Sequence, residues 1–190
     1  SSGNIGSVRI AQSLGVEKFK NFLNDLNLIN PINFDIEEMG IPIKFNWGKC
    51  KLATSSYGHG ITTTLLQLTT AYSIIVNGGY KINPSLIKQR SMIKNKKILN
   101  NNVSKKINPI LRKVVSTKEG TASLANVEGY EVGGKTGTAE KSNAGGYSNN
   151  KINTFVSFFP TSKPKYVFVV MLDEPKTNSE YIYNYRDGSE

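Results

Sequence analysis

The sequence contains a single cysteine, Cys50, and a single histidine, His59. One cysteine excludes an internal disulfide bond and a cysteine-based metal cluster, and one histidine excludes a histidine-rich metal site. We therefore expect no metal or other cofactor. Nucleophilic chemistry would need a base other than histidine, unless His59 itself served. Because His59 lies between Gly58 and Gly60, we expect it in a loop and bonded to backbone, rather than acting as an acid or base.

The sequence also lacks a long hydrophobic run, since no segment approaches the roughly 18 apolar residues that a membrane-spanning helix needs. Its 190 residues are 38% hydrophobic and 20% charged, which is typical of one globular domain with its own core. The net charge of +10 raises the alternative of a nucleic-acid-binding module. The basic residues are mostly scattered lysines without interleaved aromatic residues, and lysine, asparagine and isoleucine share A/T-rich codons. We therefore expect no nucleic-acid partner.

Apolar periodicity predicts helices early in the chain and strands late. Four segments have a helical pattern: 5–14, 16–28, 63–76 and 109–124. Three later segments have a strand pattern: 127–139, 153–159 and 165–172. The connecting segments are a loop at 31–60, two short strand-like pieces within 80–99, a polar loop at 142–150 and a turn at 160–164. This order predicts an α+β fold with an antiparallel sheet, and the nearly all-apolar last strand should be covered on both faces.

One stretch, Gly133-Gly134-Lys135-Thr136-Gly137-Thr138-Ala139, carries recognisable chemistry. It places a lysine and two hydroxyls around a glycine on an expected edge strand. A cation, hydroxyls and backbone N–H groups together suit an anionic substrate. The alternative is that Lys135 is a solvated edge-strand charge that blocks aggregation.

The same stretch spells the third box, Lys-Thr-Gly, of the class B penicillin-binding proteins, and three further blocks resemble their transpeptidase domain in the same order. Ser2-Gly3-Asn4 resembles the second box, Ser-x-Asn. The blocks between the two boxes are Ala53–Ile61 with the following helix to Asn77-Gly78-Gly79, and Val114-Val115 through Gly120-Thr121-Ala122. The resemblance continues to Asp173-Glu174-Pro175. It implies a partial transpeptidase domain over residues 1–176 and a polar tail over 177–190 that we expect to be flexible.

The resemblance implies an antiparallel sheet flanked by helices, in the fold of penicillin-binding proteins and serine β-lactamases, incomplete at both ends. The family's nucleophile lies in a Ser-x-x-Lys box upstream of Ser-x-Asn, so it is expected before Ser1. Three Ser-x-x-Lys strings follow the second box instead, and about two are expected by chance: Ser85–Lys88, Ser91–Lys94 and Ser162–Lys165. We interpret all three as decoys. We therefore expect the chain to be an inactive fragment of a membrane-anchored protein at the periplasmic face of the bacterial inner membrane.

The activity that the resemblance implies is peptidoglycan cross-linking through a serine acyl-enzyme. Lys135, Thr136 and Thr138 would bind the terminal carboxylate of a D-Ala-D-Ala stem peptide, and Gly137 would let the strand backbone approach it. The backbone N–H of Thr138 would form half of an oxyanion hole. The implied partners are the stem peptide, β-lactam antibiotics and cell-wall synthesis or division proteins.

Ser2 would relay a proton and Asn4 would hold the substrate amide. One alternative is that Ser2 and Asn4 are only a helix N-cap pair. Another is that Ser1-Ser2-Gly3 is a cloning remnant, and the second box then rests on Asn4 alone. For the function, the alternatives are a D,D-carboxypeptidase or β-lactamase-like hydrolase of the same fold, and a non-catalytic β-lactam sensor.

Overall fold

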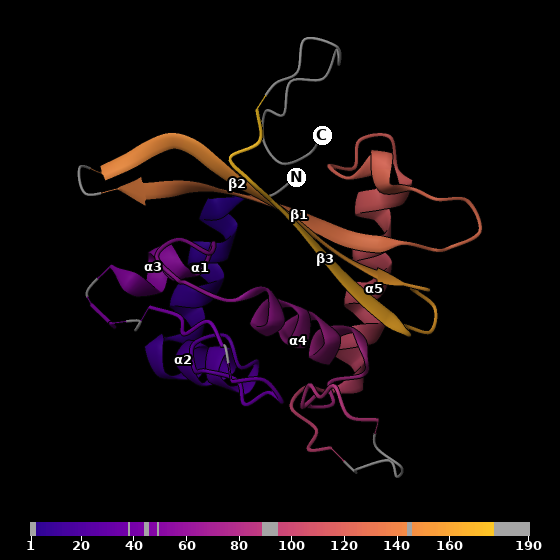
Figure 1. Cartoon of the computed structure of the whole chain (residues 1–190), viewed down its shortest axis with the longest axis horizontal. Coiled ribbons are helices and arrows are strands. Elements are labelled where there is room, and N and C mark those ends of the chain that lie inside the picture. The colour runs from indigo at the N-terminus through magenta and orange to yellow at the C-terminus, as the bar shows by residue number, and fades with distance from the viewer. Residues whose placement is uncertain are drawn as a thin grey trace. The chain divides into compact units, whose positions relative to one another are not determined.

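The computed structural model describes residues 3–37, 39–43, 46–48, 50–88, 95–143 and 146–176. The expected tail at 177–190 lies outside these residues. The chain divides into two compact units, Ser1–Asn100 and Asn101–Glu190. Figure 1 labels the elements of both, and each unit is described by itself below.

The first unit is helical. Its elements are α1 (Asn4–Leu14), α2 (Val16–Asp25), α3 (Lys51–Ser55) and α4 (Leu65–Val76). Gly15 separates α1 from α2 with a φ of 81°, a conformation that favours glycine. Both α2 and α3 pack against α1. The predicted helices and the break between them are confirmed, whereas the five-residue helix α3 replaces part of the loop expected at 31–60.

Helix α4 supplies the core of this unit and is fixed at its start. At its start Thr64 and Gln67 form a capping box, which satisfies two backbone N–H groups. The buried Gln67 amide also donates to the carbonyl oxygens of Asn27 and Asn30, at 3.1 and 2.8 Å. Ala71 and Ile74 then pack with Leu26 in the buried core. One polar side chain therefore joins the helix start to the chain that leaves α2.

The segment after α4 runs back along the helix end with little regular pairing. Within its described residues, 77–88 and 95–100, one bridge joins Tyr80 and Lys97, where two strand-like pieces were expected. Leu99 donates its backbone N–H to the Gly79 carbonyl at 3.1 Å. A Cβ on Gly79 would lie 2.2 Å from the Leu99 carbonyl oxygen, so the close approach of the two backbones requires glycine at this position.

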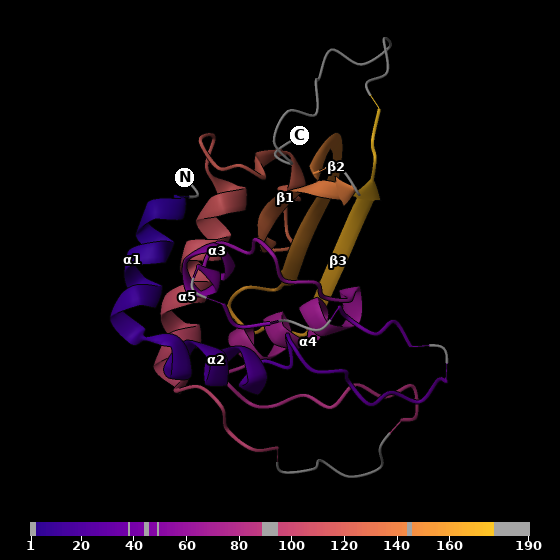
Figure 2. The same ribbon diagram turned by 90° about the vertical axis from the view of Figure 1, so that its left-hand side faces the viewer.

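The second unit is a helix packed against a three-stranded antiparallel sheet of order β1-β2-β3. Its elements are α5 (Asn101–Ser116), the 3-10 turn η1 (Ser123–Ala125), β1 (Gly133–Asn143), β2 (Gly146–Phe159) and β3 (Tyr166–Asp173). Figure 2 shows the three strands side by side. The buried residues Val115, Ala122 and Val132 hold the helix end, the following loop and the entry to β1 together. The α+β class and the antiparallel meander are confirmed.

Three expectations for this unit are wrong in detail. Helix α5 begins at Asn101 and contains Pro109, whereas the prediction began it at Pro109. The loop expected at 142–150 is largely strand, because β1 and β2 extend into it. Strand β3 is not covered on both faces: Phe168 and Leu172 keep 59% and 53% of their surface exposed. In the described part of the second unit, no helix covers these two side chains.

Candidate functional site

The sequence-predicted stretch from Lys135 to Thr138 lies within β1, the edge strand of the sheet. Among the described residues, β1 has a strand neighbour on one side only, where Lys135 pairs with Val156 and Gly137 with Thr154. Its outer edge therefore offers backbone groups to an added strand or extended ligand. Side chains alternate along a strand, so Lys135 and Gly137 share one face and Thr136 and Thr138 share the other.

Lys135 is partly buried. Its Nζ donates a hydrogen bond of 2.6 Å to the Thr136 carbonyl oxygen. Burial lowers the pKa of this ammonium from the ordinary lysine value, because water is removed from the charged form. This environment differs from that of a solvated edge-strand lysine. The desolvated cation instead suits an anion that binds beside it and restores the lost stabilisation.

Thr136 and Thr138 differ in their surroundings. Thr138 is exposed, whereas Thr136 is partly buried. The Thr136 hydroxyl donates a hydrogen bond of 3.1 Å to the hydroxyl of Thr121, in the loop between α5 and η1. The sequence carries no signal for this pairing, because the two residues are 15 positions apart and only the fold brings them together. Thr121 is therefore a candidate site residue that pattern analysis missed.

The glycines of this stretch fall into two kinds. A Cβ on Gly133 would lie 2.6 Å from the Thr161 methyl group, and one on Gly134 would lie 2.5 Å from the Val156 carbonyl oxygen. These two glycines are therefore required by packing. A Cβ on Gly137 would meet its nearest neighbour, the Thr154 carbonyl oxygen, at an ordinary 3.9 Å. Packing in the described structure gives no reason for glycine at 137.

A polar network holds the entry to β1. Arg112 of α5 donates to the Val132 carbonyl at 2.7 Å and to the Asn126 side chain at 2.9 Å. The Glu131 carboxylate accepts from the backbone N–H and the hydroxyl of Ser162, at 3.2 and 2.6 Å. These bonds lower the pKa of Glu131, the hydroxyl bond being the largest cause. Helix α5 and the β2–β3 turn therefore both fix the start of the strand.

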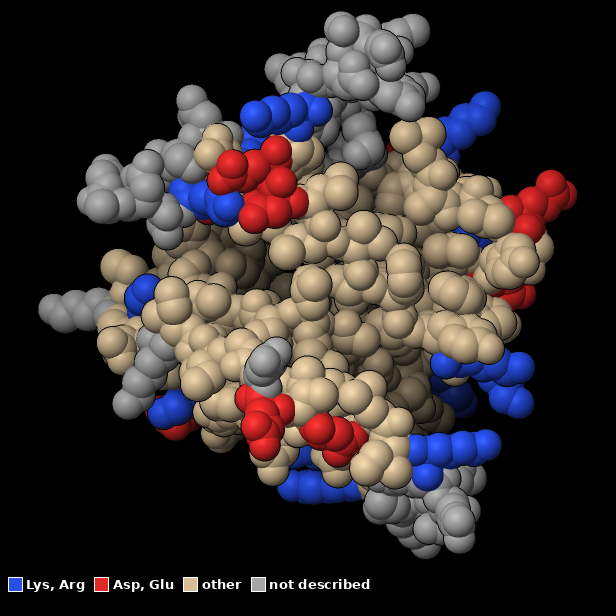
Figure 3. All heavy atoms as spheres, viewed as in Figure 1, with Lys and Arg blue, Asp and Glu red and all other residues tan. Residues whose placement is uncertain are grey.

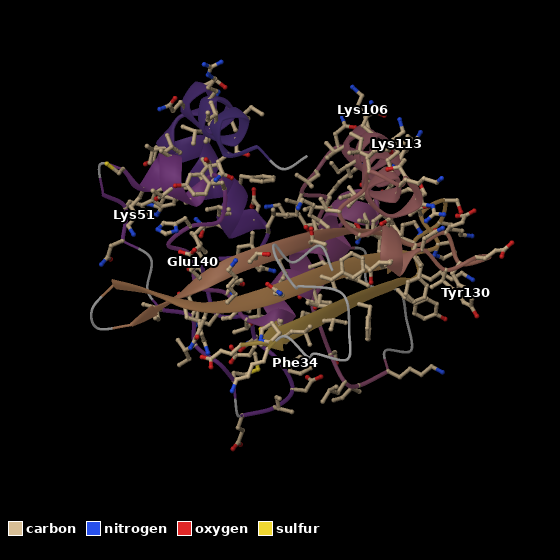
Figure 4. All side chains as sticks on the ribbon, turned by 90° about the horizontal axis from the view of Figure 1, so that it is seen from above. Phe34, Lys51, Lys106, Lys113, Tyr130 and Glu140 are labelled. Carbon is tan, nitrogen blue, oxygen red and sulfur yellow. The ribbon has the colours of Figure 1, made fainter. Side chains whose placement is uncertain are left out.

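The far half of β1 is tied to the end of β3. Lys141 Nζ lies 2.8 Å from Asp173 Oδ1 and 2.8 Å from Glu174 Oε1. Figure 4 labels Tyr130 just before β1 and Glu140 in its far half, and the two lie toward opposite ends of the strand. The stretch from Lys135 to Thr138 lies between these two anchored regions. A fixed strand is what a preorganised binding edge requires.

The second-box residues lie in the other unit. Asn4 is the exposed first residue of α1, and the N-cap is Gly3, without a side-chain capping bond. Asn4 is therefore inside the helix and does not act as its cap. Ser2 lies outside the described residues. Residues 135–138 lie together on β1 in the second unit. Asn4 is described only within the first unit.

Two of the three Ser-x-x-Lys strings fall in described residues, and neither lies in a helix. The Ser85 hydroxyl donates to Asp35 Oδ2 at 2.6 Å, and the Ser162 hydroxyl donates to Glu131. Serine and lysine three positions apart share a face only when the segment is helical. Both environments agree with the interpretation of these strings as decoys. The string Ser91–Lys94 lies outside the described residues.

The remaining candidates add little chemistry. His59 lies in a loop, as expected, where its backbone N–H donates to the Thr54 carbonyl at 3.0 Å. The described residues contain no group of three or more His, Cys, Asp or Glu side chains able to hold a metal. No helix in the described part of the chain is long and apolar enough to cross a membrane. On the face drawn in Figure 3, lysine and arginine side chains lie in separate groups.

Comparison with known proteins identifies the family. Residues 1–187 match the penicillin binding protein transpeptidase domain. The chain therefore belongs to this family. Its matches include class B penicillin-binding proteins. Stage V sporulation protein D of Bacillus subtilis is 35% identical over 95% of this chain and 30% of its own length. The probable peptidoglycan D,D-transpeptidase PenA of Neisseria flavescens is 32% identical over 95% and 46%. The chain thus spans about a third to a half of these curated relatives.

Solved structures of the same family resemble this fold. The transpeptidase domain of Burkholderia pseudomallei penicillin-binding protein 3 matches with a TM-score of 0.84 and 29% identity, over 90% of this chain and 54% of that one. Penicillin-binding protein 3 of Mycobacterium tuberculosis, solved in complex with ampicillin, matches with a TM-score of 0.83 and 26% identity, over 92% and 43%.

Proposed function

We propose that this chain is the C-terminal part of a peptidoglycan D,D-transpeptidase that also binds β-lactams. The observation that carries the proposal is the desolvated Lys135 on an edge strand, next to two threonine hydroxyls and an unobstructed Gly137. The parent protein acts at the periplasmic face of the bacterial inner membrane, with cell-wall synthesis or division proteins as partners. Residues 1–176 form the part of the transpeptidase domain contained here.

The substrate is a stem peptide that ends in D-Ala-D-Ala. Its terminal carboxylate binds the hydroxyls of Thr136 and Thr138 and the Lys135 ammonium. The Lys135 side chain leaves the opposite face of β1, but its hydrogen bond to the Thr136 carbonyl oxygen keeps the ammonium beside the strand. The peptide backbone approaches the outer edge of β1 as an added strand, and Gly137 keeps a Cβ out of its way. These contacts hold the scissile carbonyl in a fixed position, which converts a bimolecular attack into an effectively intramolecular one.

The reaction is acyl transfer in two steps. A serine oxygen attacks the carbonyl between the two D-alanines, an acyl-enzyme ester forms, and the C–N bond breaks to release the terminal D-alanine. The amine of a second stem peptide then attacks the ester, forms the cross-link and frees the serine. The Thr138 N–H stabilises the oxyanion in both steps. Ser2 carries the proton from the nucleophile to the leaving nitrogen, and Asn4 binds the substrate amide.

The nucleophile is a serine in a Ser-x-x-Lys box upstream of Ser1. Support comes from the loop positions of Ser85 and Ser162 and from the carboxylates that they contact. The pKa of Asp35 and of Glu131 is lowered, the serine hydroxyl bond being the largest cause, so neither carboxylate is suited to take the proton of a nucleophile. The short span of the chain relative to its curated relatives also leaves room for this box elsewhere in the parent protein.

Labelling with a fluorescent penicillin tests the proposal. The 190-residue chain should not form a covalent adduct, whereas the full-length parent protein should form one, stable in denaturing electrophoresis. Replacing the upstream serine by alanine in the parent should abolish the adduct. Covalent labelling of the short chain at Ser85, Ser91 or Ser162 would contradict the location of the nucleophile, and failure of the parent to label would contradict the function.

A further inference from the structure

The hydrogen bond between Thr136 and Thr121 links the candidate anion-binding strand to a loop that the catalytic boxes do not include. The two hydroxyl oxygens lie 3.1 Å apart, with Thr136 as the donor. Lys135 Nζ lies 2.6 Å from the carbonyl oxygen of the same Thr136. Thr136 therefore makes two contacts: its carbonyl oxygen accepts from the Lys135 ammonium, and its hydroxyl donates to Thr121.

The backbones of the two residues that flank Thr121 hold it in place. On one side the Gly120 N–H donates to the Thr117 carbonyl at 3.1 Å, and on the other the Ala122 N–H donates to the Val114 carbonyl at 3.2 Å. A Cβ on Gly120 would lie 2.1 Å from the Val114 carbonyl oxygen, so only glycine allows the loop to close onto the end of α5. Ala122 is 5% exposed and belongs to the core. The Thr121 hydroxyl thus has little freedom to move away from Thr136.

We propose that Thr121 is a positioning residue for the anion that binds at Thr136; this rests on the proposed function. A hydroxyl can donate one hydrogen bond and accept others. Without a ligand, Thr136 donates to Thr121. When a carboxylate binds, the Thr136 hydroxyl donates its hydrogen bond to the carboxylate. The Thr121 hydroxyl then rotates and donates to the Thr136 oxygen. No covalent bond changes, and the direction of one hydrogen bond reverses.

The reversed arrangement strengthens binding of an anion in particular. In the chain from Thr121 to Thr136 to the carboxylate, each hydroxyl polarises the next, so the last donor becomes a better one. The bond from Thr121 also fixes the Thr136 hydroxyl in the orientation that the ligand needs. A neutral ligand group at the same place accepts a weaker hydrogen bond from the Thr136 hydroxyl. Thr121 should therefore affect anionic ligands more than their neutral analogues.

The test compares benzylpenicillin with its methyl ester on the full-length protein. In Thr121→Val, which removes the hydroxyl and keeps the side-chain shape, the second-order acylation constant for the free acid should fall about three- to tenfold, the effect of one ordinary hydrogen bond. The constant for the ester should stay within about twofold of wild type. Thr121→Ser should restore the free-acid constant. Thr117→Val, which removes a hydroxyl bonded to the Lys113 carbonyl in the same loop, is the matched control and should leave both constants unchanged.

Each outcome bears on a different claim. An equal loss with acid and ester in Thr121→Val would show a merely structural role and overturn the proposal, as would an unchanged free-acid constant. Thr121→Ala replaces the valine variant if thermal unfolding shows that valine is not accommodated. If the wild-type protein does not acylate at all, the proposed function fails and the role of Thr121 with it. If wild type acylates and Thr121→Val acylates at the wild-type rate with both ligands, the Thr121 proposal alone fails.

Discussion

Replacing Lys135 by methionine should reduce β-lactam acylation of the full-length protein about 100-fold and leave the fold at least as stable. The loss follows from removing a charge-assisted hydrogen bond to the ligand carboxylate, which contributes ~1.5–3 kcal/mol. The retained stability follows from the partial burial of the ammonium, which lowers its pKa. A charge that folding removes from water opposes folding, whereas a methionine of similar length keeps the apolar contacts.

The stability of the wild type should depend on pH through Lys135. Because the folded-state pKa of Lys135 is lowered, the unfolded chain binds this proton more tightly than the folded chain. Stability of the wild type therefore rises with pH between the folded-state pKa and the unfolded value near 10.5, and it is lowest relative to Lys135→Met below that interval. The stability difference between the variant and wild type should shrink as pH rises through it. It should stay below about 1 kcal/mol throughout, because the group retains part of its water.

Urea unfolding at neutral and alkaline pH measures this difference on the 190-residue chain, and penicillin acylation measures the function on the parent protein. Lys163→Met, at an exposed lysine of the β2–β3 turn, is the control and should change neither quantity. A Lys135→Met variant that acylates at the wild-type rate would remove Lys135 from the site. A variant that is less stable than wild type at neutral pH would show that the lysine is structural.

The elements that local chemistry specifies could be predicted from the sequence. Gly15 separates two amphipathic helices because its positive φ suits glycine, and α4 begins where Thr64 and Gln67 form a capping box. The start of α5 could not be predicted in this way. Its first residues are Asn-rich, and Pro109 inside the helix normally marks a helix start. The part of α5 before Pro109 buries Ser104 and Asn108, two polar residues that give no apolar pattern, and packing of this kind commonly outweighs propensity.

The same distinction applies to the site. Lys135, Thr136, Gly137 and Thr138 are consecutive, so a short motif and the alternation of a strand were sufficient to predict their common location on β1. The contact of Thr136 with Thr121 depends on how the loop after α5 folds back, and no local pattern encodes it. The partial burial of Lys135, which lowers its pKa, likewise is not encoded in the motif and arises only in the folded structure. Sequence therefore predicts which groups are present, and tertiary structure determines how they are tuned.

Gly134 and Gly137 should respond in opposite ways to the same change. Gly134→Ala should destabilise the chain by about 3 kcal/mol, since its Cβ would lie 2.5 Å from the Val156 carbonyl and 2.7 Å from the Phe155 ring, and neither strand backbone can move without loss of pairing. Gly137→Ala should leave stability unchanged or raise it by up to ~1 kcal/mol. Its Cβ has room, its φ is not among the positive values, and alanine restricts the unfolded chain.

When acylation is measured on the folded protein, Gly137→Ala should have the larger effect of the two substitutions. In the full-length protein, Gly137→Ala should lower penicillin acylation about tenfold, because the new methyl group stands at the edge where the ligand backbone approaches. Denaturant unfolding followed by circular dichroism gives the stability of both variants, and acylation is measured on the folded fraction. Wild-type acylation by Gly137→Ala would show that no ligand approaches β1 at this position. A strongly destabilised Gly137→Ala would mean instead that this glycine, like Gly134, is retained for packing.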